Sequence, residues 1–252
     1  MRRLVIVAAL ALGVAAPAQA QTTAPAPTAR ALAGYTVVLD PGHNGGNGGA
    51  MTAISRQVWA GTLWKDCDTT GASTDDGYNE AAHNFDVALR VRRILRAQGA
   101  RVVLTRFTNT GVGPCITQRA AVGNRLRADA AVSIHADGNL DDSYHGFHVI
   151  LPADEGQGAR MLTGSYRLGL AIRDALRDLG PTAPSNYIGE DGLIVRDDLG
   201  GLNLSRVPKV FTEIGNMHST HDAPAIGSPT GREQEASAIA TGIARFLTGR
   251  RV

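Results

Sequence analysis

The sequence predicts a single α/β domain, built on a mostly parallel twisted sheet with helices on both faces. Short apolar runs alternate along the chain with longer segments whose apolar residues recur at helical spacing, which is typical of βαβ units. The 252 residues, 43% of them hydrophobic, are also enough for one domain with a substantial core. An active site is then expected at the C-terminal edge of the strands.

The first twenty residues have the layout of a secretory signal peptide: two arginines, an apolar run, and the small-residue sequence Ala18-Gln19-Ala20. A membrane anchor is the alternative, but the run is shorter than the roughly 20 residues that span a bilayer. We therefore expect export to the periplasm or the extracellular cell wall, with removal of residues 1–20. Residues 21–30, rich in Pro, Ala and Thr, are expected to be a disordered leader to a folded domain at 31–252.

The elements of that domain follow in order. The expected sequence is strand Thr36–Leu39, helix Asn79–Gln98, strand Arg101–Thr105, helix Ile116–Arg127, strand Ala130–Ile134, strand Phe147–Leu151, helix Leu162–Leu179, strand Val210–Glu213 and helix Glu233–Leu247. The clearest helix is the first, which has helical apolar spacing and stops at Gly99, a normal C-terminal signal. Residues 44–78 and 181–205 show no period, and such long irregular stretches are usually functional or mobile.

Charge and cysteine content narrow the function classes. Removal of residues 1–20 takes away two of the 25 basic residues and none of the 23 acidic ones, so the mature chain is formally neutral. Nucleic acid is therefore not an expected partner, and we expect a monomer without a membrane span. Cys67 and Cys115 are best interpreted as one disulfide, worth roughly 4 kcal/mol in the loop-entropy model. A reactive thiol is less favoured, because neither cysteine has a neighbouring His.

Three expected strands lead to residues that can act as ligands or catalysts. His43 follows the first strand in VVLDPGH, His135 follows AAVSI, and Glu213 ends KVFTE. Because the carboxyl ends of parallel strands meet at one crevice, these residues can share a site although they lie far apart in sequence.

Glu80 opens the first helix, after the N-cap residue Asn79. Alone, it is best explained as a carboxylate that complements the helix dipole. Beside two histidines at strand ends, it becomes the third ligand of a zinc site with His43 and His135, which leaves the fourth position for water. His83, one turn further along the helix, is an alternative to one of the histidines.

Glu213 is expected to act as general base on the zinc-activated water and then as proton donor to the leaving amine. The alternative is that it orients a ligand histidine. Asp137 could orient a ligand or the substrate. Weaker groove candidates, each more often a surface or packing residue, are Arg106, Arg119, His145, His148, His218 and His221.

An ordered set of six sequences resembles one enzyme family. DPGHNGG, the helix NEAAHNFDVALRVRRILRAQG, RVVLTR, QRAAVGNR, SIHADG and VFTEIGN are similar to the zinc-dependent N-acetylmuramoyl-L-alanine amidases of the type 3 amidase family, over residues 34–248. Three features depart from that pattern. Asp137 stands where the family usually has Asn, Asn47-Gly48-Gly49-Ala50 stands where it has a Gly-Asp-Gly-Ala type pattern, and a longer insertion lies between Gly49 and Glu80.

The resemblance implies Zn²⁺ bound by His43, Glu80 and His135, with Glu213 as the catalytic carboxylate. It also implies peptidoglycan or its muropeptide fragments as substrate, cleaved at the amide bond between N-acetylmuramic acid and L-alanine of the stem peptide. Alternatives are a zinc carboxypeptidase or deacetylase acting on the same polymer, or a non-catalytic wall-binding module. The last is least favoured, because all four positions are filled.

Overall fold

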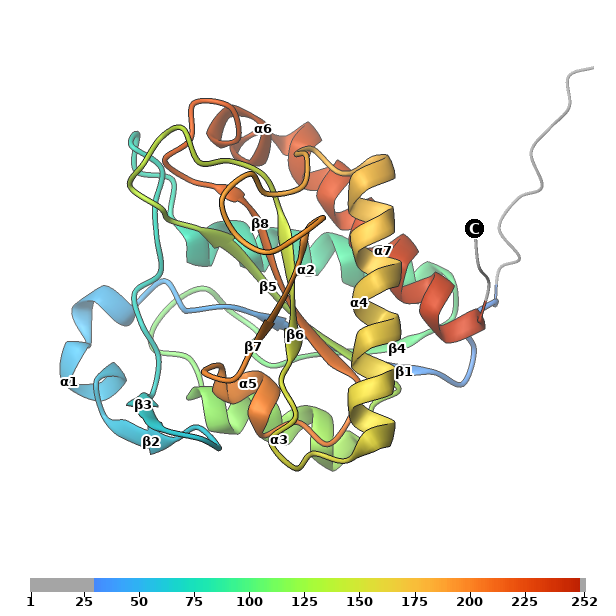
Figure 1. Ribbon diagram of the computed structural model, residues 1–252. Helices are drawn as coiled ribbons and strands as arrows, with labels where there is room; N and C mark the ends of the chain where they lie inside the picture. Colours follow the sequence, from blue (N-terminus) through green and yellow to red (C-terminus); the bar gives the residue numbers. More distant parts are fainter. Residues whose placement is uncertain (1–29, 250–252) are drawn as a thin grey trace, which may run out of the picture.

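The computed structural model describes residues 30–249, so the expected signal peptide and all of the expected leader except its last residue lie outside the described part. The predicted α/β domain is confirmed (Figure 1). Its main sheet has six strands in the order β4-β1-β5-β8-β6-β7. In that order the strands are β4 (Arg101–Leu104), β1 (Thr36–Pro41), β5 (Ala130–Asp137), β8 (Lys209–Asn216), β6 (His148–Pro152) and β7 (Leu193–Arg196).

The sheet is mostly parallel, as predicted. β4, β1, β5 and β8 run in the same direction, and β6 pairs with β8 in the antiparallel sense, with β7 parallel to β6. Two registers matter for the site. His135 of β5 lies opposite Glu213 of β8, and His148, the first residue of β6, lies opposite Glu213 on its other side.

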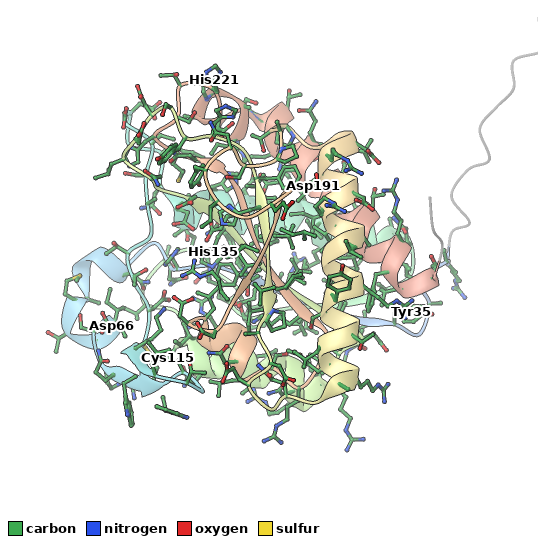
Figure 2. All side chains as sticks on the ribbon, in the orientation of Figure 1. Tyr35, Asp66, Cys115, His135, Asp191 and His221 are labelled. Atoms are coloured by element: carbon green, nitrogen blue, oxygen red, sulfur yellow. A yellow bond between two sulfur atoms is a disulfide. The ribbon has the colours of Figure 1, made fainter. Side chains whose placement is uncertain are left out.

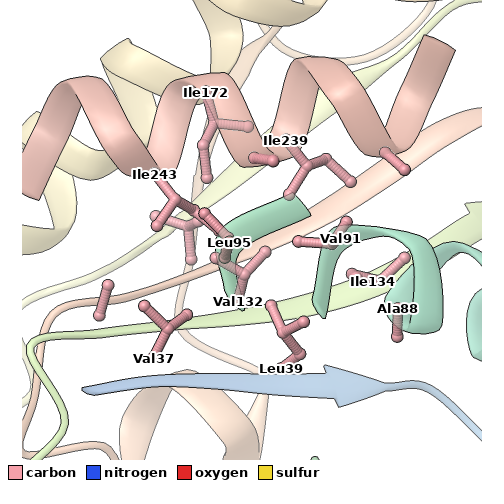
Figure 3. Close-up of a cluster of buried hydrophobic side chains, with 14 of the residues drawn as sticks. Val37, Leu39, Ala88, Val91, Leu95, Val132, Ile134, Ile172, Ile239 and Ile243 are labelled. Atoms are coloured by element: carbon pink, nitrogen blue, oxygen red, sulfur yellow. The ribbon is translucent and has the colours of Figure 1, made fainter. Parts of the chain in front are cut away.

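Helices cover both faces of the sheet, which is also as predicted (Figure 1). One face carries α2 (Glu80–Ala97), α4 (Ala159–Leu179) and α7 (Pro229–Thr248), and the other carries α3 (Ile116–Leu126) and α5 (Gly200–Asn203). Figure 3 shows the larger core, where strand residues meet helix residues. Val37 and Leu39 point into this core, whereas Val38 packs toward α3, as the period of two along a strand requires.

The two irregular stretches contain short elements that the sequence does not reveal. Within 44–78 lie a 3-10 helix η1 (Asn47–Gly49), a helix α1 (Met51–Ile54) and a hairpin of β2 (Gln57–Trp59) and β3 (Trp64–Asp66). β7 and α5 lie within 181–205, and α6 (Ala223–Gly227) precedes α7. Elements of three to five residues are too short to show a period.

Two predicted helices begin earlier than expected, at Ala159 and at Pro229. α7 begins there because Ser228 caps it, accepting a hydrogen bond from the Gly231 amide at 2.9 Å, and a proline fits the first turn. No helix within residues 30–249 is long and apolar enough to cross a membrane.

The predicted disulfide is present between Cys67 and Cys115, 48 positions apart. Cys115 is the N-cap residue of α3, and the Ile116 amide donates a hydrogen bond to the Cys67 carbonyl at 2.9 Å. The end of the hairpin segment is therefore fixed to the start of α3.

Candidate metal centre and active site

The three predicted ligands meet at the C-terminal edge of the sheet. His43 follows β1, Glu80 is the first residue of α2, and His135 lies in β5. The Glu80 carboxylate lies between the imidazoles, with Oε2 3.2 Å from His43 Nε2 and Oε1 2.9 Å from His135 Nδ1. One donor atom from each residue lies within 4.8 Å of the others, and residues 30–249 contain no other such group of three.

Local contacts hold the Glu80 carboxylate in place. The Asn79 side chain accepts a hydrogen bond from the Ala81 amide at 2.8 Å, which starts α2 at Glu80. The carboxylate then accepts from the Ala72 amide at 2.8 Å and from Asn84 Nδ2, one turn along the helix, at 3.1 Å. These donors orient the carboxylate toward the histidines.

The backbone around His43 is equally constrained. His43 has φ 55°, in the left-handed region that a non-glycine residue rarely adopts. A Cβ on Gly42 would lie 2.0 Å from Cε1 of His135, so only glycine fits there. Arg106 and Arg119, two of the weaker candidates, are buried and donate to the carbonyls of Gly42 and His43 at 3.1 and 2.9 Å. These two arginines therefore hold the backbone at Gly42 and His43 in place.

Asp68 is a site residue that the sequence did not reveal. Its Oδ1 lies 3.3 Å from His43 Nδ1, and its Oδ2 accepts from Arg119 Nη2 at 3.0 Å. A carboxylate on the second ring nitrogen fixes the orientation of a metal-binding histidine and makes it a stronger ligand. Its place after Cys67 in the sequence does not mark it as a site residue. Only the fold brings Asp68 next to His43.

A cluster of buried charged residues stabilises the C-terminal end of β1. Asp40 lies 3.2 Å from both Lys209 Nζ and Arg119 Nη1, and it accepts from the hydroxyl of Ser133 at 2.7 Å. Burial alone would raise the pKa of Asp40, but the charges of Lys209 and Arg119 hold it far below its usual range. This carboxylate is therefore ionised and fixes β1 to β5 and β8.

The electrostatics of the site favour a cation. Burial opposes a charge on His43, yet the charge of Glu80 and the hydrogen bond that His43 donates to Asp68 raise its pKa to about 10. Burial likewise opposes ionisation of Glu80, but the two histidines lower its pKa well below the usual range. A metal bound here would displace the proton that the raised pKa keeps on His43.

Glu213 lies beside the predicted ligands, but its pKa is shifted in the opposite direction from that of Glu80. Burial raises its pKa well above the usual range, and the negative charges of Glu80 and Asp137 add to the shift. His148, opposite it on β6, is almost fully buried, and this burial lowers its pKa to about 4. Glu213 is therefore a carboxyl group that holds a proton readily beside a neutral imidazole.

Asp137 and Tyr187 form a pair near Glu213. The Tyr187 hydroxyl donates to Asp137 Oδ2 at 2.5 Å, and burial together with this hydrogen bond raises the pKa of Tyr187 above its usual range. Tyr187 lies in the stretch 181–205, and nothing in its sequence surroundings identifies it.

Two pockets meet at the predicted metal ligands, and both include His43 and His135. One, of about 450 Å³, extends toward the hairpin and is lined by Leu63, Trp64 and Phe211 among others. The second, of about 370 Å³, is polar and includes Glu213, Asp137 and His218. In Figure 2, His135 lies near the middle of the molecule, with Asp66 of the hairpin to the lower left and His221 at the top.

His83, the alternative ligand, lies away from the cluster. It is fully buried between α2 and α7, with Nε2 3.1 Å from Glu235 Oε2, although the angles are not those of a hydrogen bond. His145 and His221, two weaker candidates, have their rings 5.1 Å apart and line neither pocket.

Comparisons with known proteins agree with this geometry. A family model described as N-acetylmuramoyl-L-alanine amidase matches residues 37–245. An N-acetylmuramoyl-L-alanine amidase of Mycobacterium tuberculosis is 40% identical over 221 residues, covering 87% of this chain and 89% of that protein. A germination-specific N-acetylmuramoyl-L-alanine amidase of Bacillus subtilis is 26% identical, with 88% and 84% covered. The crystal structure of an N-acetylmuramyl-L-alanine amidase from Mycobacterium smegmatis is 41% identical, with TM-score 0.82 and 87% and 99% covered.

Proposed function

Because the chain belongs to the N-acetylmuramoyl-L-alanine amidase family, we propose that His43, Glu80 and His135 are the metal ligands of this enzyme and that Glu213 is its catalytic carboxylate. The protein is a peptidoglycan amidase, which cleaves the bond between N-acetylmuramic acid and L-alanine of the stem peptide. The observation that carries the assignment of residues is the convergence of three donor atoms within 4.8 Å at the sheet edge.

We propose zinc as the metal. Two imidazoles and one carboxylate are the ligand set of many catalytic zinc sites, and the adjoining pockets leave room for water and substrate. The fit is supported by the Glu80 carboxylate, which lies between two ring nitrogens and needs a cation there. Bound at this place, zinc would polarise the scissile carbonyl and lower the pKa of water.

The remaining chemistry belongs to Glu213. Its carboxylate form accepts a proton from the attacking water, and its raised pKa then lets the carboxyl group keep that proton. The same oxygen gives the proton to the nitrogen of L-alanine as the amide bond breaks. A cation held by the neighbouring ligands would oppose this rise in the pKa of Glu213, so the group can serve in both forms.

Peptidoglycan is an extracytoplasmic polymer, so the enzyme acts outside the cytoplasm. We propose that residues 1–20 are the signal peptide that exports it and that residues 21–30 are a leader to the catalytic domain. The cysteines, which form a disulfide, support an oxidising compartment.

The test is the substitution Glu213→Gln in the purified enzyme. It removes the proton-accepting group without touching a ligand, so we expect a turnover lower by about 10² to 10⁴-fold and a zinc content still close to about one per chain. Turnover is measured as intact stem peptides released from peptidoglycan, identified by mass spectrometry.

Glu155→Gln, at an exposed carboxylate remote from the site, is the matched control and should change neither quantity. Full turnover by Glu213→Gln would assign the base to another residue. Shortened stem peptides or free acetate as products of the unmodified enzyme would instead indicate a peptidase or a deacetylase.

A further inference from the structure

Both tryptophans of the chain lie in the β2–β3 hairpin, and both are exposed. Trp59 is 47% exposed and Trp64 63% exposed, and their rings contact each other across the hairpin with centroids 5.8 Å apart. Large aromatic residues are usually well buried, so an exposed pair indicates a binding surface. Figure 1 shows the hairpin at the rim of the molecule, beside α1.

The hairpin is held firmly in position. The Cys67–Cys115 disulfide fixes one end. At the tip, Asn203 of α5 donates to the carbonyl of Ala60 at 3.1 Å, and the Thr62 hydroxyl donates to the Asp197 carbonyl at 2.7 Å. The tryptophans are therefore presented in a fixed arrangement, which lowers the entropy cost of binding a ligand to them.

The tryptophan surface continues into the metal centre. Trp64 and Leu63 line the same pocket of about 450 Å³ as His43 and His135. Gln57 and Asp66 line the same wall, and their side chains are hydrogen-bonded to each other, so polar groups stand beside the aromatic surface. A pyranose ring has matching properties: its C–H faces pack on aromatic rings, while its hydroxyl and acetamido groups need hydrogen-bond partners.

The position of Glu213 sets the direction of the substrate. Glu213 lines the polar pocket but not the pocket beneath the hairpin. The leaving amine of L-alanine must lie beside the group that protonates it, so the stem peptide extends into the polar pocket. The acyl side of the scissile bond carries the sugar, and it must extend the opposite way, toward Trp64.

We propose that the pocket beneath the hairpin, which Trp64 lines and beside which Trp59 packs on Trp64, binds N-acetylated sugar rings of the glycan strand. This assignment rests on the proposed function and adds which end of the substrate lies on which side of the metal ligands.

The first test uses tryptophan emission, which reports on this hairpin alone because the chain has no other tryptophan. The probe is a stem-free oligosaccharide of alternating N-acetylglucosamine and N-acetylmuramic acid, which has no stem amide bond to cleave. We expect saturable changes in emission with this probe and none with free stem peptide. An effect of the peptide but not of the glycan would overturn the proposal.

The second test compares variants on soluble, stem-bearing glycan chains. Trp64→Ala should raise KM about tenfold, the effect of losing one aromatic contact, while kcat changes less than about twofold because no group at the reacting atoms is altered. Trp64→Phe should restore most of the affinity. Tyr166→Ala, at an exposed aromatic residue on α4, is the matched control.

The two proposals fail in different ways. If the native enzyme releases stem peptides normally but Trp64→Ala has an unchanged KM, the glycan assignment alone is wrong. If the native enzyme releases no stem peptides, the function itself is wrong, and the glycan assignment fails with it.

Discussion

Helix α2 carries two histidine–carboxylate clusters one turn apart, and they differ in every property that matters for metal binding. At its first residue, Glu80 lies between His43, which follows β1, and His135 of β5, where two pockets meet. One turn later, His83 meets Glu235 of α7, and both side chains are 0% exposed. The residue types are the same, but the second cluster lacks a third donor and any path to solvent.

The comparison indicates that the direction in which a side chain points decides whether it can serve as a metal ligand. Glu80 faces the ends of the strands, whereas His83 faces α7. The first cluster brings three donor atoms together beside a pocket, whereas the second packs two buried side chains between α2 and α7. Four substitutions can break or sharpen this contrast, beginning with the largest expected effect.

Replacing His135 and His83 in turn tests the contrast directly. His135→Ala removes a ligand and should reduce both zinc content and activity to background. His83→Ala should leave both unchanged and should lower the free energy of unfolding by roughly 1–3 kcal/mol, because Glu235 loses its buried partner. Metal analysis and denaturant unfolding measure these effects. Loss of zinc from a folded His83→Ala protein would contradict the contrast.

Gly42→Ala tests whether the position before His43 must lack a side chain. The new Cβ would lie 2.0 Å from the His135 ring, so the ring must move. We expect zinc affinity to fall about a hundredfold, in line with the cost of overpacking. Gly48→Ala is the control, since nothing lies within 4 Å of a Cβ there. Competition with a chelator measures the affinity, and equal values for the two variants would exclude the steric argument.

Asp68→Asn tests the carboxylate behind His43. The amide keeps the shape of the side chain but loses the charge that orients the imidazole, so zinc affinity should fall about tenfold. Asp142→Asn, at an exposed carboxylate, should have no effect. If the two variants bind zinc equally well, Asp68 only pairs with Arg119.

The sequence predicted the regular part of this molecule, because that part depends on local pattern. It also predicted that His43 and His135 converge at the sheet edge, because each stands at or just after the end of a strand. Thr36–Leu39 is an apolar run and the helix from Asn79 has helical apolar spacing; His43 follows the first and Glu80 begins the second. The approach of Asp68 and Tyr187 was not predictable, since each reaches its partner through tertiary contacts of an aperiodic loop. β7 was missed for another reason: it has four residues and no alternation of burial.

The pairing of β5 with β8 has a consequence for how this enzyme can change over time. His135 and Glu213 lie opposite each other in the ladder, so backbone geometry fixes their separation. Insertions and deletions in 44–78 or 181–205 leave that ladder untouched. The groove can therefore acquire new preferences by remodelling its loops, while the reacting groups keep their spacing.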